Sequence, residues 1–222
     1  MNRPATVAPD RGPTVERFVL GPLEVNTYLV YDKTGREGLL IDPADEDTGL
    51  LARIRKLGFP GWRIFLTHGH ADHILGVTFF RQKLGAPVII GREDAAMLED
   101  SHLNLSDMLG MGFSTGPAET VAGHGDRLTV GSFPAEILGI PGHTPGGLAL
   151  HFPGLVFSGD TLFAGGIGRS DFPGGDGARL VAMIRERLLS LGEAEVFPGH
   201  GPSTTLRCEG ATNPFLQAGS LL

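Results

Sequence analysis

Three of the chain's eight histidines lie within a single stretch of six residues. His68, His70 and His73 occur with Asp72 in the sequence HGHADH. Imidazole nitrogens and carboxylate oxygens are ligands that suit Zn²⁺, Fe²⁺ or Mn²⁺. A single histidine in a loop is usually a solvated side chain, but histidines and an aspartate at this spacing predict a metal site.

Further candidate ligands follow downstream, each just after a short apolar run. His143 lies in PGHTPGG, Asp160 in SGDTLF and His200 in FPGHGPST. In open α/β sheets, ligands bind beyond the carboxyl ends of the strands. If the apolar runs are strands that end at one sheet edge, the polar residues after them meet there. We therefore expect one cluster of seven side chains: His68, His70, Asp72, His73, His143, Asp160 and His200.

Seven ligands are more than one tetrahedral zinc ion needs, and they match two metal ions that share a carboxylate. Two metals about 3.5–4 Å apart can hold a bridging hydroxide at neutral pH, because each lowers the pKa of bound water toward about 7. Cys208, the single cysteine, lies outside the set. Zinc is the expected metal, with iron or manganese as alternatives. A closed structural site takes four ligands, so the larger set favours an enzyme over a metal-stabilised binding module.

The composition is typical of a globular protein of one domain. The chain has 222 residues, a net charge of −7, 34 glycines and 16 prolines. Glycine and proline at this level predict many tight loops, in which sites are usually built. The acidic balance opposes a nucleic-acid or anionic-membrane partner. Neither a signal peptide nor a membrane span is expected, so a cytoplasmic location is predicted; the sequence predicts no oligomeric state.

Hydrophobic spacing and turn residues predict the elements that position the cluster. Residues 1–13 are expected to form a flexible tail, and residues 99–122 an irregular segment. The expected strands cover residues 15–20, 26–31, 38–41, 63–66, 87–90, 127–130, 135–140, 148–152, 155–158 and 195–197. The expected helices, each followed by glycine, cover residues 47–57, 74–84 and 180–191. The prediction is one mixed α/β domain over residues 14–222.

The chain resembles the metallo-β-lactamase fold superfamily through HGHADH and the three downstream ligands. GDTLFAGGIGRSDFPGGD (159–176) and GHGPSTTLRCEGATNPFL (199–216) resemble its short, single-domain glyoxalase II-like branch. The resemblance implies an αββα sandwich, in which two mixed β-sheets are flanked by helices. It also implies metal ligands in two groups joined by a bridging Asp160: His68, His70 and His143 for one ion, and Asp72, His73 and His200 for the other.

The resemblance implies hydrolysis of a thioester such as S-D-lactoylglutathione or a related thiol conjugate. A bridging hydroxide, oriented by Asp72 and Asp160 as catalytic residues, is expected to attack the thioester carbonyl. A thiol has a pKa of about 8.5, so a thiolate leaves without a strong general acid. Full-length glyoxalase II enzymes carry a C-terminal helical domain that grips glutathione. No such domain is expected here, which leaves the thiol carrier and the acyl group open.

Persulfide dioxygenases, which bind a single iron, are the main alternative. They are similar to this chain in HGHADH and in GRSDF (168–172). TLFAGGIG (161–168) and NPFL (213–216) favour the hydrolase. True β-lactamases resemble the chain less, because they lack an aspartate at the position of Asp160. Flavo-diiron proteins carry glutamate in place of His70. Ribonucleases of this fold act on a polyanion and usually add a binding module, which the net charge of −7 opposes.

Arg169 is the predicted substrate-binding residue. It follows a glycine-rich run, and glycine lets the backbone approach a ligand closely. A planar guanidinium can bind a carboxylate through two hydrogen bonds. The alternative is a structural pair with Asp171 or Asp176. A second open question is whether the apolar residues of the segment 99–118 cap the site or only anchor a surface loop.

Overall fold

The first of two β-sheets is built from the N-terminal half of the chain. The computed structural model describes residues 5–7 and 12–217. The first four strands of this sheet pair in antiparallel fashion, and the remaining strands add in parallel. The strand order is β1 (Ala5–Val7), β2 (Thr14–Leu20), β3 (Val25–Tyr31), β4 (Glu37–Ile41), β5 (Gly61–Phe65), β6 (Val88–Gly91) and β7 (Thr120–Ala122).

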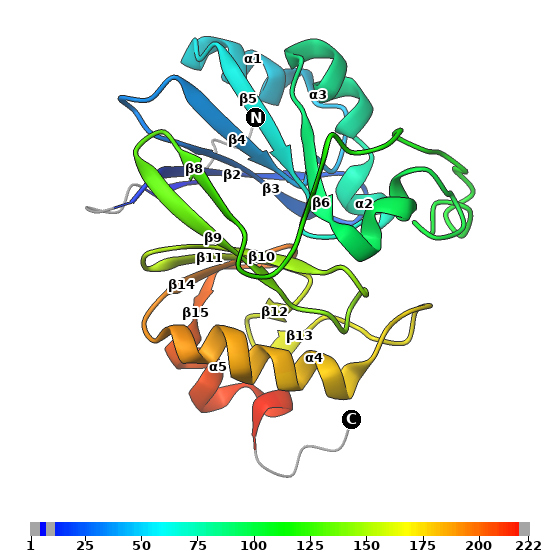
Figure 1. Ribbon diagram of the computed structural model, residues 1–222, viewed down its shortest axis with the longest axis vertical. Helices are drawn as coiled ribbons and strands as arrows, with labels where there is room; N and C mark the ends of the chain where they lie inside the picture. Colours follow the sequence, from blue (N-terminus) through cyan, green and yellow to red (C-terminus); the bar gives the residue numbers. More distant parts are fainter. Residues whose placement is uncertain (1–4, 8–11, 218–222) are drawn as a thin grey trace.

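The second sheet comes from the C-terminal half and packs face to face on the first (Figure 1). Its order is β15 (Thr204–Thr205), β14 (Glu195–Pro198), β11 (Leu155–Gly159), β10 (Leu148–Phe152), β9 (Phe133–Gly139) and β8 (Arg127–Val130). Strands β11 and β14 are parallel neighbours, so both end at the same edge. A small hairpin, β12 (Leu162–Phe163) and β13 (Gly166–Ile167), follows β11 at that edge.

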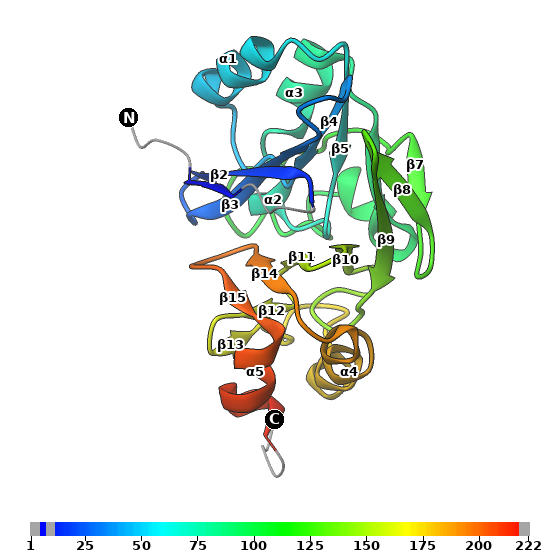
Figure 2. The same cartoon turned by 90° about the vertical axis from the view of Figure 1, so that its left-hand side faces the viewer.

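Helices cover the outer face of each sheet, which gives the expected αββα sandwich (Figure 2). The helices α1 (Thr48–Leu57), α2 (Ala71–Ile74) and α3 (Val77–Leu84) belong to the first sheet. The helices α4 (Gly177–Met183) and α5 (Leu206–Thr212) lie below the second sheet. Shorter helical turns are η1 (Arg92–Leu98), η2 (Ile184–Leu188), η3 (Leu189–Leu191) and η4 (Pro214–Leu216). No described helix has the length and hydropathy needed to cross a membrane.

Three apolar cores fill the three interfaces between these four layers. The central core joins both sheets and contains Tyr28, Phe157 and Phe197. A second core packs α1 and α3 on the first sheet, and a third packs α4 and α5 on the second sheet. Burial of apolar surface in all three fixes the layers relative to each other. The ends of the strands are therefore held in fixed positions.

The predicted helix 74–84 begins at Val77 in the structure, where it forms α3, and Ile74 instead ends the separate short helix α2. The break falls at Gly76, whose N–H donates to the Pro43 carbonyl at 2.8 Å. A Cβ atom at Gly76 would lie 2.4 Å from the Asp45 carbonyl oxygen. This close backbone contact separates α2, which carries metal-ligand candidates, from α3.

The predicted helix 180–191 begins earlier and changes its winding. Asp176 accepts a hydrogen bond from the Arg179 N–H at 2.9 Å and caps α4, which therefore starts at Gly177. The helix continues as a π-helical turn and a 3₁₀ turn. Helix α5, capped by Thr205, and strand β7, within the segment predicted to be irregular, were not expected.

The predicted flexible tail 1–13 includes a strand. Ala5–Val7 forms β1, which pairs in antiparallel fashion with β2. The outer edge of β2 offers unpaired N–H and C=O groups, and such an edge accepts a further strand. Residues 1–4 and 8–11 of the predicted tail lie outside the described residues.

Candidate metal centre

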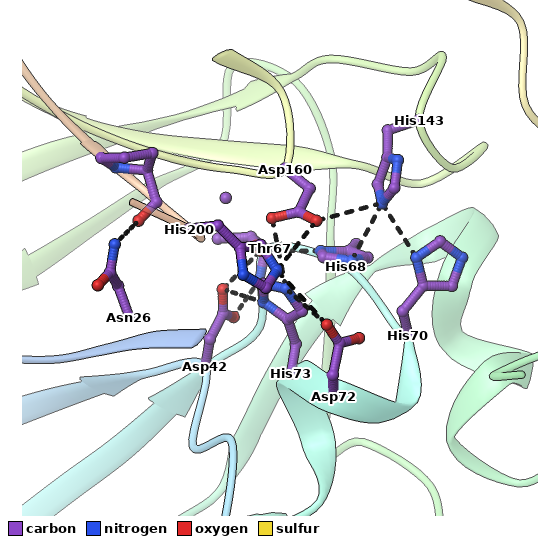
Figure 3. A network of polar contacts seen from close by, with 12 residues as sticks. Asn26, Asp42, Thr67, His68, His70, Asp72, His73, His143, Asp160 and His200 are labelled. Atoms are coloured by element: carbon purple, nitrogen blue, oxygen red, sulfur yellow. Dashed lines mark hydrogen bonds and ion pairs between the residues drawn. The ribbon is translucent and has the colours of Figure 1, made fainter. Parts of the chain in front are cut away.

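All seven predicted ligands meet at the edge where the strands of the two sheets end (Figure 3). The loop after β5 and the start of α2 supply four of them. The loops after β9, β11 and β14 supply one each. The first sheet thus provides His68, His70, Asp72 and His73, and the second provides His143, Asp160 and His200.

One group of three buried imidazoles forms the first half of the cluster. His70 Nδ1 lies 3.0 Å from His143 Nε2, which lies 3.3 Å from His68 Nε2. Burial lowers the pKa of His68 well below its usual value and lowers the pKa of His70 to about 3. His143 Nδ1 donates to the Arg169 carbonyl at 2.6 Å, which leaves its Nε2 lone pair facing the cluster. Neutral imidazoles with free lone pairs are what a metal ion requires.

The second group consists of Asp72, His73 and His200. Asp72 Oδ2 lies 3.7 Å from His73 Nε2 and 3.5 Å from His200 Nε2. Burial would raise the pKa of Asp72, but His73 and His200 hold it below its usual range, so the carboxylate is ionised. One ionised carboxylate and two imidazoles form a second set of metal-ligand donors.

Asp160 lies between the two groups. Its Oδ1 is 3.4 Å from His73 Nε2, and its Oδ2 is 3.5 Å from His200 Nε2 and 3.8 Å from His143 Nε2. The carboxylate therefore reaches nitrogens of both groups. This is the position that a bridging ligand requires, and bridging itself stays a prediction.

The cluster contains buried polar atoms that a cation would satisfy. His73 Nε2 and Asp160 Oδ1 are buried and lie 3.4 Å apart, and no other described atom offers either of them a hydrogen bond. Such atoms cost about 1–3 kcal/mol each when left unpaired. Burial opposes a charge on His73, but Asp160 and Asp72 raise its pKa well above the usual value, so a proton there offsets their charge. A bound divalent ion would replace that proton. The donor set of five imidazoles and two carboxylates thus fits two divalent metal ions.

Asp42 orients two of the ligands and was not predicted from the sequence. Its Oδ2 accepts from His73 Nδ1 at 3.0 Å and from the Thr67 hydroxyl at 2.7 Å, and its Oδ1 accepts from the Thr67 N–H at 2.8 Å. The Thr67 oxygen in turn accepts from His68 Nδ1 at 3.1 Å. These contacts place the ring protons on Nδ1 and leave Nε2 free for metal. The sequence signal that could have identified Asp42 is its position, because it directly follows strand β4, just as several predicted ligands follow their strands.

Asp94 and Asn26 hold the loops that carry His143 and His200. Buried Asp94 accepts from the Thr144 hydroxyl at 2.7 Å and from the Gly146 N–H at 2.6 Å. Buried Asn26, on β3, donates from its side chain to the carbonyls of Pro198 and Gly201 at 2.9 and 2.8 Å. Each contact spans at least 50 positions of sequence. Neither residue has a sequence pattern that could have predicted its role.

Arg169 lies beside the cluster but is paired. Its guanidinium donates two hydrogen bonds of 2.7 Å to the Asp171 carboxylate and stacks on the Phe172 ring at 4.0 Å. Asp176, the other partner considered, caps α4 instead. Arg169 also lines the cavity above the metal ligands. Its role in substrate binding stays a prediction.

A cavity of about 590 Å³ opens directly onto the cluster. Part of the segment 99–118 forms one of its walls through Leu105, Met108 and Leu109. The three histidines outside the predicted ligand set do not line this cavity: His102 and His124 are exposed, and His151 is half-buried on β10.

Comparison with protein families agrees with this architecture. Residues 20–200 match the model of the metallo-beta-lactamase superfamily. A probable metallo-hydrolase of Bacillus subtilis, YqgX, is 37% identical over 92% of this chain and 98% of its own. The hydroxyacylglutathione hydrolase GloC of Haemophilus influenzae is 34% identical over 93% of this chain and 99% of its own.

Several crystal structures share this fold. The BLEG-1 B3 metallo-beta-lactamase superposes with a TM-score of 0.86 at 34% identity, over 92% of this chain and all of that one. TTHA1623 in a di-iron-bound form superposes with a TM-score of 0.78 at 41% identity, over 90% of this chain and 99% of that one. ETHE1 of Myxococcus xanthus superposes with a TM-score of 0.76 at 28% identity, over 90% of this chain and 83% of that one. The match over most of the chain and the converging histidines and aspartates show that this protein is a metallo-hydrolase of the metallo-beta-lactamase superfamily.

Proposed function

We propose that the protein hydrolyses thioesters such as S-D-lactoylglutathione or a related thiol conjugate, with two divalent metal ions. The observation that carries the proposal is Asp160, whose carboxylate lies between two groups of metal-ligand donors at the floor of a cavity. A relative described as a hydroxyacylglutathione hydrolase supports the same reaction, because its sequence is similar over nearly the full length of both chains.

The residues present indicate which side chains would hold the metals. His68, His70 and His143 would hold one ion, and Asp72, His73 and His200 the other, with Asp160 shared between them. Zinc is the expected metal, with iron and manganese as alternatives; one similar structure holds two irons. Ions bound there lower the pKa of water toward neutrality and polarise a carbonyl group.

The chain itself positions the reactants. Asp72 and Asp160 are ionised and are 17% and 12% exposed, so both carboxylates reach the cavity and can accept hydrogen bonds from an attacking water. Apart from the metal-ligand candidates and Arg169, the described side chains that line the cavity are apolar. The leaving group is a thiolate of pKa about 8.5, so no separate acid residue is needed.

Metal analysis and a comparison of substrates test the proposal. Protein purified without chelator should contain two metal ions per chain and should cleave S-D-lactoylglutathione faster than a cephalosporin. Asp160→Asn should lower kcat/KM by about a hundredfold or more, because ligand loss disturbs both metal binding and water activation. His102→Asn, an exposed histidine outside the cluster, is the matched control.

Two outcomes would overturn the proposal. One iron per chain with oxygen consumption on glutathione persulfide would assign the protein as a mononuclear iron persulfide dioxygenase. A turnover of cephalosporin above that of every thioester would assign it as a β-lactamase, which is the description of one similar structure.

A further inference from the structure

The cavity above the metal ligands has apolar walls. Leu23 comes from the turn between β2 and β3, and Phe163 from β12. Leu105, Met108 and Leu109 come from one segment after η1, defined here as the wall segment, residues 100–111. These parts of the chain are far apart in sequence and face the same opening. The walls therefore form an apolar surface that continues from the metal-binding floor.

Several of these side chains are unusually exposed for their type. Met108 is 70% exposed, Leu109 50% and Leu23 49%. Single exposed apolar residues are common on proteins, but apolar residues gathered at one opening mark a binding surface. Leu103 and Met111 extend the apolar character of the wall segment without lining the cavity.

The wall segment is held in place by buried polar contacts. The Asn104 side chain is fully buried and donates to the carbonyls of Met97 and Phe113 at 3.0 and 3.1 Å. Its Oδ1 accepts from the Ser106 N–H at 2.9 Å. Its carbonyl accepts from the N–H of Ala71, the first residue of α2, at 2.8 Å. The wall is therefore bonded to the helix that carries two metal-ligand candidates, and it is organised before a substrate arrives.

The cavity offers little positive charge for a carboxylate. Among the described residues that line it, Arg169 is the one arginine or lysine. Its guanidinium already donates two hydrogen bonds to the Asp171 carboxylate, and Phe172 covers one face. A thiol carrier with several carboxylates would have to displace Asp171 to gain this cation. An uncharged apolar chain meets complementary surface without that competition.

We infer that the substrate is a thioester with an unbranched, medium-length apolar chain that packs against Leu105, Met108 and Leu109. This inference rests on the proposed function and narrows its substrate class. In the reaction, the water oxygen bonds to the acyl carbon and the carbon–sulfur bond breaks. The products are a carboxylate and a thiol, and one proton is released. Carbon and sulfur keep their oxidation states, so no oxidant or reductant is needed.

A series of thioesters on one small uncharged thiol tests the inference. We would measure kcat/KM for the acetyl, butyryl, hexanoyl and octanoyl thioesters of N-acetylcysteamine. One buried methylene gives about a fourfold gain when fully desolvated. Partial burial should therefore give about a tenfold rise for every two methylenes added. The acetyl thioester of octanethiol carries the apolar chain on the thiol side, so comparison of its kcat/KM with that of the octanoyl thioester identifies the side whose chain contacts the wall.

Variants connect the effect to the wall segment. Met108→Gln with Leu109→Gln should remove most of the dependence on chain length, because polar side chains then line the same surface. Leu103→Gln is the matched control, since Leu103 is 43% exposed on the same segment but does not line the cavity. This control should keep the full chain-length dependence and the wild-type melting temperature.

Binding of an uncleavable analogue keeps the inference testable if the reaction is different. S-octyl-N-acetylcysteamine, a thioether, should bind in calorimetric titrations with a negative heat-capacity change, and the double variant should weaken binding by about tenfold. If the thioether binds but no thioester is cleaved, the proposed reaction fails and the apolar site stands. If thioesters are cleaved at rates independent of chain length and the thioether does not bind, the inference is wrong and the hydrolase stands.

Discussion

Replacing Asp42 with asparagine should weaken metal binding although Asp42 is not itself a ligand. The buried carboxylate accepts from His73 Nδ1 and from both the hydroxyl and the N–H of Thr67. Asparagine has the same shape and tolerates the positive φ of 48° found at this position. The substitution therefore removes one negative charge and exchanges one acceptor oxygen for an NH₂ donor, while the backbone is preserved.

The expected magnitude follows from the contacts that change. With its amide oxygen at the Oδ1 position, the introduced asparagine side chain still accepts from the Thr67 N–H, and its NH₂ group faces His73 Nδ1 and the Thr67 hydroxyl. The NH₂ favours the His73 tautomer with its proton on Nε2, the atom that faces the cluster. Replacing such an outer partner costs about 10- to 100-fold in metal affinity, or about 1.4–2.7 kcal/mol. The loss of affinity should be larger for the ion held by Asp72, His73 and His200, because Asp42 contacts His73 directly.

Chelator competition with a fluorescent indicator would measure each metal affinity, and metal analysis after mild dialysis would give the stoichiometry. Asp32→Asn is the matched control. Asp32 is also buried and accepts from Thr34 and Ser132, but it lies outside the metal cluster. The control should lose stability in urea and keep both metal ions.

The reasoning fails if Asp42→Asn retains two metal ions with both affinities within about threefold of the wild type, well short of the loss expected at an outer partner. It also fails if Asp32→Asn loses metal to the same extent, because the effect would then follow general destabilisation. Loss of the ion at His73 alone, with an unchanged apoprotein melting temperature, would support the tautomer argument most directly.

Two further predictions concern charged pairs outside the cluster. Because Asp171 competes with substrate for the Arg169 guanidinium, Arg169→Ala should raise KM for S-D-lactoylglutathione more strongly in an Asp171→Asn background than in the wild type. Equal effects on KM in steady-state kinetics would mean that Arg169 stabilises its loop and does not bind substrate. Burial would raise the pKa of Glu16, but hydrogen bonds from Arg53 and Tyr31 lower it below its usual value. Glu16→Gln should therefore cost about 1–3 kcal/mol at pH 7, and urea unfolding should show this difference shrinking as the pH falls below about 4.3, where the unfolded glutamate is protonated. A difference that is constant from pH 7 to pH 3 would contradict the second prediction.

The metal cluster could be predicted because its members carry a signal in sequence. Four of them lie within six residues, and His143, Asp160 and His200 each follow an apolar strand. Among the residues that orient and hold these ligands, Asp42 directly follows a strand, but Asp94 and Asn26 carry no such signal. Asp94, for example, is a single aspartate whose partners lie about 50 positions away. Only the packed fold brings such partners together.

The difference between local sequence patterns and tertiary contacts also explains why some helices and helix boundaries were not predicted. Helix α5 was not expected because Glu209 lies on its buried side, where an apolar residue would have shown the helical period. That carboxylate is 2% exposed and accepts hydrogen bonds from the Gly165 N–H, the Thr204 hydroxyl and the Asn213 amide. Hydrophobic periodicity in the sequence cannot reveal which tertiary partners will bury a polar side chain. The break at Gly76 likewise depends on a backbone contact with residues 43–45.

The geometry of the metal cluster depends on how the two sheets pack, because each sheet supplies part of the ligand set. Tyr28 of the first sheet packs edge-on against Phe157 and Phe197 of the second, at ring distances of 5.2 and 5.8 Å. Its hydroxyl donates to the Pro198 carbonyl at 2.7 Å, two residues before His200. The Leu148 N–H, at the start of β10, donates to the Thr67 carbonyl at 2.7 Å. The inter-sheet core thus sets the distance between the ligands that the first sheet supplies and those that the second sheet supplies, and a metal ion bound by both sheets would stabilise the same interface in return.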